Sequence, residues 1–144
     1  ISGVGGIDTR GTDTNMIRIN STNSYAGGTR VTSGRLRVYE SGTLGTGPVT
    51  VSAGTTLDLD NATAISDTAA LTLNVGTNTY GVVDLSSGVT ESVGTLTING
   101  NLQYSGTYGA TGSGAIFIND NHFVGTGKLL VLDGKPRPTV ITIK

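Results

Sequence analysis

A short unit of alternating residues recurs along the chain and constrains its fold more than any other feature. The unit is a glycine followed by alternating polar and aliphatic residues, and it occurs at 34–38, 54–59 and 94–98. Because successive side chains of a strand point to opposite faces, this alternation predicts short, half-buried strands. Glycine permits the positive φ angles that sharp corners need. Repetition of one strand-and-corner unit is typical of stacked turns and favours a solenoid.

The same alternation continues along the chain with no helical period. The stretch 61–70 is rich in alanine, but Thr63, Ile65 and Thr68 are weaker helix formers, so we interpret it as a loop. Without helix-length connections, an antiparallel sandwich or barrel and a solenoid both fit, and the repetition favours the solenoid. The predicted fold class is all-β, a right-handed parallel β-helix (β-solenoid) of short rungs. The expected strands are 16–19, 29–32, 35–38, 49–51, 55–59, 71–73, 82–85, 95–98, 115–118, 128–132 and 139–143.

Composition excludes several classes of protein. Charged residues are 13% of the chain and its net charge is −1, so no basic surface is available to follow phosphates and we expect no nucleic-acid partner. The longest apolar runs are far too short for a membrane span. Cysteine is absent, which removes disulfides and thiolate metal sites. We expect no cofactor.

The 144 residues suffice for one domain with a modest core. We expect residues 1–134 to form a single β-helix domain that begins with a glycine-rich segment. Residues 135–144 are expected to form a proline-containing linker and a C-terminal β-strand tail.

The two ends of the predicted solenoid are expected to be uncapped. A solenoid end exposes unpaired backbone groups and open apolar turns, and the glycine-rich start is a poor cap. The C-terminal tail either folds back as the last strand of its own domain or pairs with the next molecule. Head-to-tail pairing does not close, so it predicts a homo-oligomeric filament. The predicted self-association residues are Ile1, Val4, Ile7, Thr139, Val140, Ile141, Thr142 and Ile143.

Two stretches resemble a known family. Residues 24–36 run as an aromatic residue, a small residue, Gly-Gly-Thr, a strand and then Gly-x-Leu, and 42–51 continue into a further rung. This order resembles the autotransporter-associated β-strand repeat. Residues 97–127 resemble the C-terminal end of many such bacterial surface proteins. The resemblance implies a parallel β-helix displayed at or released from a bacterial cell surface, with no catalytic residues.

Candidate metal ligands lie in two polar segments. Asp8, Asp13 and Asn15 space oxygen atoms around a glycine, loosely as in a calcium loop, and Asp120 lies between two asparagines. The first segment lacks the bidentate glutamate of an EF-hand. Local turns made by Asx side chains are the better explanation of both segments, and we favour that interpretation.

Candidate catalytic residues are few. Asp58 and Asp60 alternate in one strand and so share a face, where they predict either a calcium or proton-abstraction site or a solvated surface, and we favour the surface. His122 is the only histidine, and we expect its ring to pack in a turn.

Surface contacts with glycans have two candidate residue sets. Arg30, Arg35 and Arg37 alternate on neighbouring strands and could form a basic stripe for acidic glycans, although solvated arginines are the default. Five tyrosines could form a strip that stacks on carbohydrate, but we favour a role in covering ends and corners of the stack. They are Tyr25, Tyr39, Tyr80, Tyr104 and Tyr108.

The sequence therefore predicts a non-enzymatic extracellular structural protein of the bacterial cell surface that assembles end to end. An adhesin or passenger stalk segment is the main alternative. A polysaccharide-active β-helix enzyme is a further one, but it requires carboxylates and basic residues in one groove. Arg30, Arg35 and Arg37 lie in a different stretch from the two aspartates, which argues against it.

Overall fold

The chain is a β-solenoid built from three sheets. The computed structural model describes residues 1–10, 15–138 and 143, and no helix occurs in these residues. The first sheet has the order β1 (Ile7–Thr9), β3 (Thr29–Val31), β5 (Val49–Val51), β7 (Ala70–Leu73), β10 (Thr95–Ile98) and β11 (Asn101–Leu102). The second has the order β2 (Met16–Ile19), β4 (Arg35–Val38), β6 (Thr56–Leu59), β8 (Val82–Leu85) and β14 (Phe123–Gly125). The third has the order β13 (Phe117–Ile118), β12 (Gly106–Gly109), β15 (Lys128–Val131) and β9 (Thr90–Val93).

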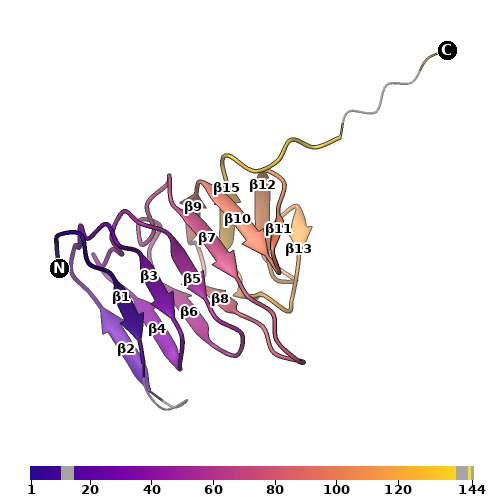
Figure 1. The fold of residues 1–144 in the computed structure, drawn as a ribbon. Coiled ribbons are helices and arrows are strands. Elements are labelled where there is room, and N and C mark those ends of the chain that lie inside the picture. The colour runs from indigo at the N-terminus through magenta and orange to yellow at the C-terminus, as the bar shows by residue number, and fades with distance from the viewer. Residues whose placement is uncertain (11–14, 139–142, 144) are drawn as a thin grey trace.

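Equivalent strands of successive turns stack in parallel, which confirms the predicted β-solenoid. Strands β1, β3, β5, β7 and β10 pair in parallel one after another, as do β2, β4, β6, β8 and β14. The turns follow one another from the N-terminal end, in indigo, to the C-terminal end, in yellow (Figure 1).

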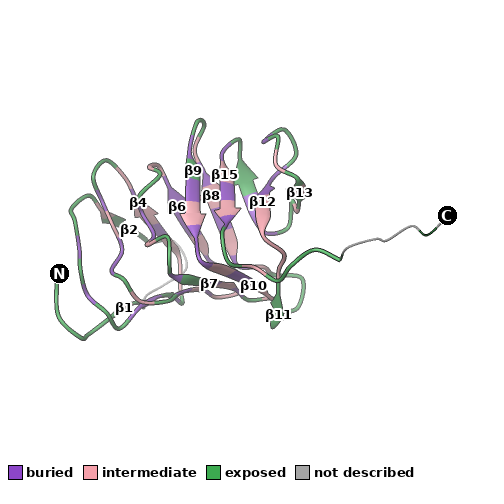
Figure 2. Ribbon diagram, turned by 90° about the horizontal axis from the view of Figure 1, so that it is seen from above, coloured by how far each residue is buried: buried purple, intermediate pink, exposed green. Residues whose placement is uncertain are grey.

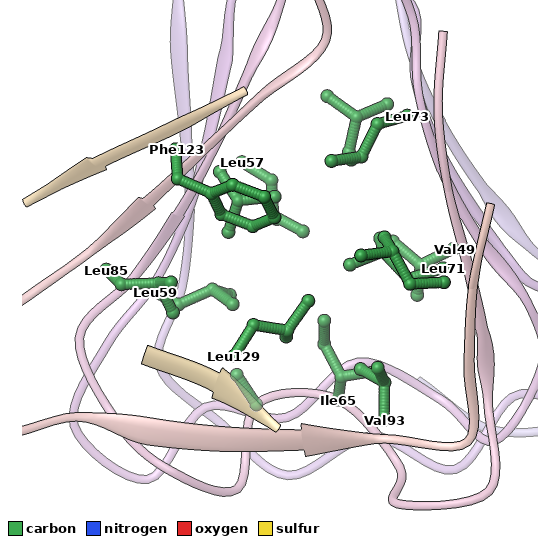
Figure 3. Close-up of a cluster of buried hydrophobic side chains, with 14 of the residues drawn as sticks. Val49, Leu57, Leu59, Ile65, Leu71, Leu73, Leu85, Val93, Phe123 and Leu129 are labelled. Carbon is green, nitrogen blue, oxygen red and sulfur yellow. The ribbon is translucent and has the colours of Figure 1, made fainter. Parts of the chain in front are cut away.

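The stacking aligns aliphatic side chains into continuous ladders inside the coil. In the second sheet, Ile17, Leu36, Leu57, Val83 and Phe123 are register partners in that order. The last four of these are fully buried, and side chains from facing sheets point toward one another across the interior (Figure 3). Burial of aliphatic area at roughly 25 cal/mol per Å² is the main force that holds such a stack together.

Most predicted strands are present with shifts of a residue or two, but five observed strands were not predicted. They are β1, β9, β11, β12 and β14. In β1 and β9 the polar side chains of Thr9 and Glu91 point inward and are buried, which hides the aliphatic alternation. The predicted loop at 61–70 is confirmed as far as Ala69, and β7 begins at Ala70.

The C-terminal end of the solenoid is covered, so the prediction of two uncapped ends is wrong there. Strand β11 pairs antiparallel with β10, and β12 pairs antiparallel with β15. Tyr108 stacks on Phe117 with ring centroids 4.7 Å apart and lies 6.2 Å from the ring of Phe123. Reversal of strand direction ends the ladder of the first sheet and occurs again in the third, whereas the second sheet ends on the parallel strand β14. The aromatic rings pack over this end of the apolar interior, next to the buried Phe123. We call this group of residues, 104–123, the aromatic cap.

The N-terminal end is open. Strands β1 and β2 are the outer strands of the first two sheets. Ile17 is 40% exposed, whereas its ladder partner Leu36 is fully buried. The first turn is mostly green, whereas the strands of the central turns are largely purple and pink (Figure 2). A hollow of about 370 Å³ opens here, lined among others by Ile7, Ile17 and Ile19.

Candidate functional site

The outer face of the second sheet carries a network of ion pairs that joins three turns. The Arg35 guanidinium donates to Asp58 at 2.9 Å on the next turn and to Asp84 at 2.6 Å on the turn after it. Arg37 donates to Asp60 and lies 3.7 Å from Asp58. We call these five residues the ion-pair face.

The ion-pair face follows from register. Arg37 is directly opposite Asp58, and Arg35 is opposite Thr56, so both arginines reach aspartates two positions further along the neighbouring strand. Side chains this close on one face of a sheet interact directly. Sequence reasoning treated these arginines and aspartates as lying in different stretches, and this is corrected by the structure. The spacing of the repeats was the signal that could have paired them.

The two aspartates that alternate in β6 differ in environment. Burial raises the pKa of Asp58 and outweighs the hydrogen bond from Arg35. Burial also acts to raise the pKa of Asp60, but hydrogen bonds from Ser86 and Arg37 together lower it below its ordinary value. Asp58 and Asp60 each accept hydrogen bonds from a guanidinium, as carboxylates of a structural ion-pair network do. The basic stripe is likewise interrupted, because Arg35 and Arg37 are neutralised.

The candidate metal ligands are engaged in local hydrogen bonds. Asp8 accepts bonds from Arg10 at 3.0 Å and from Thr32 at 2.7 Å, and Asp120 accepts two from Thr111. These bonds lower the pKa of Asp8 and of Asp120.

Asn15 is exposed, and Asp13 lies outside the described residues. In residues 1–10, 15–138 and 143, no group of three or more His, Asp or Glu side chains is placed to hold a metal ion. The preference for local turns over calcium ligands at these residues stays a prediction.

His122 and four of the five tyrosines serve the packing of corners and ends. The His122 ring is buried, its Nδ1 lies 2.7 Å from the carbonyl oxygen of Gly81, and it meets the Tyr80 ring edge-on. Tyr25 is buried with its hydroxyl 2.6 Å from that of Thr29. Tyr104 and Tyr108 belong to the aromatic cap. Tyr39 differs, because it lies on the outer surface beside the arginines.

A shallow hollow lies where the ion-pair face meets the open first turn. It has a volume of about 260 Å³ and is lined by Arg18, Arg37 and Tyr39. The Arg37 guanidinium carbon lies 5.8 Å from the centre of the Tyr39 ring. Arg18 is exposed and forms no ion pair with any carboxylate in the described part of the chain. Arg18 was not singled out from the sequence, although the alternation in residues 16–19 places it on the outer face.

The predicted self-association residues are exposed where the structure describes them, apart from one. Ile1 is 72% exposed, Val4 92% and Ile143 90%, while Ile7 is half-buried in β1. Residues 139–142 lie outside the described part of the chain.

Fold and surface together define an all-β solenoid with a charged outer face. The chain is similar to the adhesin BmaC autotransporter of Brucella suis biovar 1 (strain 1330), at 39% identity over 114 residues. These residues are 74% of this chain but only 3% of the length of that adhesin. No protein-family model matches the chain, so the repeat family suggested by residues 24–36 stays a prediction. No solved structure matches it either. No helix in the described residues has the length and apolar character that crossing a bilayer requires.

Proposed function

We propose that this chain is a segment of the extracellular part of a bacterial surface adhesin, and that it serves as a rigid, non-enzymatic stalk. The observation that carries the proposal is the contrast between the two ends of the solenoid. The N-terminal turn presents β1 and β2 as edge strands, each with one neighbour, and its isoleucines are partly exposed, whereas the aromatic cap packs over the other end. An open turn of this kind accepts another turn of the same geometry.

The similarity to an autotransporter adhesin supports the cell-surface location. The absence of cysteine fits a protein whose stability comes from backbone pairing and aliphatic ladders. The carboxylates of the ion-pair face link successive turns and are held by arginines, which supports a structural role for them.

End-to-end assembly of copies is not part of this proposal. It requires a second open end, and within the described residues the C-terminal turn is covered by antiparallel strands and aromatic rings.

The location is tested with antibodies raised against the isolated chain. We expect them to label intact cells of the bacterium that produces it, and we expect external protease to remove the label. Labelling that appears only after the cells are permeabilised would contradict the proposal. The non-enzymatic role is tested separately with polysaccharide substrates: cleavage by the wild-type chain that disappears in Asp58→Asn would overturn it.

A further inference from the structure

The diagonal ion pairs of the second sheet follow a rule that fails at one place. Arg35 and Arg37 each reach an aspartate two positions beyond their register partner, at Asp58 and Asp60. Arg18 has Arg37 as its register partner, so the same diagonal leads to Tyr39. At the position on β4's turn where the diagonal from Arg18 ends, the chain has the aromatic ring of Tyr39. The equivalent position one turn later is the carboxylate Asp60.

We propose that the hollow between Arg18, Arg37 and Tyr39 binds a carboxylated sugar residue of a glycan, whose carboxylate takes the place of the missing aspartate. A guanidinium presents paired N–H donors that match a carboxylate and form charge-assisted hydrogen bonds with it. Arg18 supplies such a group at the edge of the hollow. Arg37 is already neutralised by Asp60, and it adds polar N–H groups without a second free charge.

Tyr39 supplies the surface for the sugar ring. Its side chain is partly exposed and lines the hollow together with the two arginines. An aromatic face packs against the apolar C–H side of a flat ring, while the polar edge of the ligand stays hydrated. The volume of about 260 Å³ lies just below the roughly 300–1,000 Å³ of pockets for drug-sized ligands, so it suits one sugar residue of a longer glycan.

The charges also exclude a polyanion held by its backbone. Such binding needs several free cations along one track. On this face Arg35 and Arg37 are paired with aspartates, whereas Arg18 has no carboxylate partner within residues 1–10, 15–138 and 143. The site thus favours a ligand with a single carboxylate next to a ring.

The site goes beyond the proposed function and does not depend on it. The hollow lies between the turns of β2 and β4, and a further turn stacked beyond β2 leaves that outer face uncovered. Binding by the isolated chain is measured in solution, whereas the stalk function is tested by location on cells, so either can fail alone.

The test is a titration of the full chain, followed by NMR, with three oligosaccharides of similar size. One ends in sialic acid, one ends in glucuronic acid, and neutral lactose is the reference. We expect one or both acidic sugars to bind at least about 10-fold more tightly than lactose, with shifts confined to residues around the hollow. The comparison of the two acids identifies the class of carboxylated sugar.

Matched variants assign the binding to the hollow. We expect Arg18→Ala and Tyr39→Leu each to weaken binding of the acidic sugar by roughly 10-fold. Arg30→Ala removes the same charge from the outer face of the first sheet and is expected to leave binding unchanged. The proposal is overturned if wild type binds lactose as well as the acids, if Arg30→Ala weakens binding as much as Arg18→Ala, or if Tyr39→Leu has no effect. The comparison of sugars on the wild-type chain holds even if a variant fails to fold.

Discussion

At the scale of single residues, Glu91 is the most unusual side chain of the interior. Its carboxylate is fully buried and accepts hydrogen bonds from the backbone N–H groups of Ala64 and Ile65. Burial raises its pKa from 4.5 to about 7, against the opposing effect of these two bonds, and the negative charge of Asp67 adds to the rise. One acidic residue thus ties the 61–69 loop to the core.

Glu91 makes stability depend on pH. Because its pKa is higher in the folded chain than in the unfolded chain, its contribution is fully present below about pH 4.5 and is lost as pH rises through about 7. We expect the free energy of unfolding to be about 2 kcal/mol larger at pH 5 than at pH 8 from this group. Urea unfolding of wild type and Glu91→Gln across this range measures it. The variant lacks this component, and an identical pH dependence in both proteins would contradict the assignment.

The two aspartates of β6 are expected to respond differently to loss of charge. The raised pKa of Asp58 means that folding does not stabilise its ionised form. Asp58→Asn should therefore change the free energy of unfolding at pH 7 by less than about 0.5 kcal/mol. The lowered pKa of Asp60 means that its charge is stabilised, and Asp60→Asn should cost about 1 kcal/mol. That cost should shrink as the pH falls below about 3.8 and should be lost once the pH is below the lowered pKa of Asp60. Thermal unfolding measures the stability of both variants, and an equal loss of stability in the two would contradict this expectation.

Gly45 is fixed by a close approach of two turns. A Cβ atom added there would overlap the backbone carbonyl oxygen of Tyr25, and that tyrosine is fully buried. We expect Gly45→Ala to cost more than about 2 kcal/mol, because backbone on both turns must shift. Gly5→Ala is the control, since nothing lies within 4 Å of the added atom. Chemical unfolding of the two variants checks the difference, and similar stabilities would show that the turns can separate at little cost.

At the scale of elements, strand β12 has a different role from the parallel strands. It runs against β15 and places Tyr108 over the end of the core, where the Tyr108 hydroxyl donates to the carbonyl oxygen of Tyr104 at 2.8 Å. Lys135 and Arg137 lie over the rings of Tyr104 and Phe117, at 4.5 and 5.0 Å from the ring centres. The antiparallel strand and these cation–π contacts together close the last turn.

The aromatic cap should therefore stabilise the fold mainly through the buried area of the Tyr108 ring, and less through the hydrogen bond of its hydroxyl. We expect Tyr108→Ala to destabilise the chain by about 3–4 kcal/mol and Tyr108→Phe by about 1 kcal/mol. The difference separates the buried ring from the hydroxyl. Calorimetry of both variants measures it, and equal effects would mean that the bond to Tyr104 rather than the ring holds the cap.

At the scale of the whole molecule, the solenoid is asymmetric along its axis. Each turn contacts its neighbours alone, so local stability follows how many sides of a turn are covered. The first turn has one neighbouring turn, whereas the central turns have two and the last turn has the cap.

This asymmetry predicts a gradient of protection. We expect backbone amides of β1 and β2 to exchange with solvent fastest among the strands, and those of β6 and β8 slowest. In the same ladder, Ile17→Ala should cost about 1 kcal/mol and Leu57→Ala about 3 kcal/mol, because Ile17 is 40% exposed and Leu57 is fully buried. Hydrogen exchange and urea unfolding test both statements, and uniform protection would contradict them.

The sequence alone determined most strand positions and which of their side chains face inward. Alternation with period two is a local property, so 16–19, 35–38 and 95–98 appear as strands with the expected bounds. Alternation does not reveal strands whose inward residue is polar, as at Glu91 in β9.

Only the tertiary structure decided which outward side chains meet. The register between turns depends on the lengths and shapes of all the corners between them. The residue pattern within one strand therefore cannot specify it. It brought Arg35 to Asp58, left Arg18 beside Tyr39, and carried Glu91 to the 61–69 loop. The covered C-terminal end was decided at the same level, because reversal of β12 against β15 requires contacts between residues distant in the sequence.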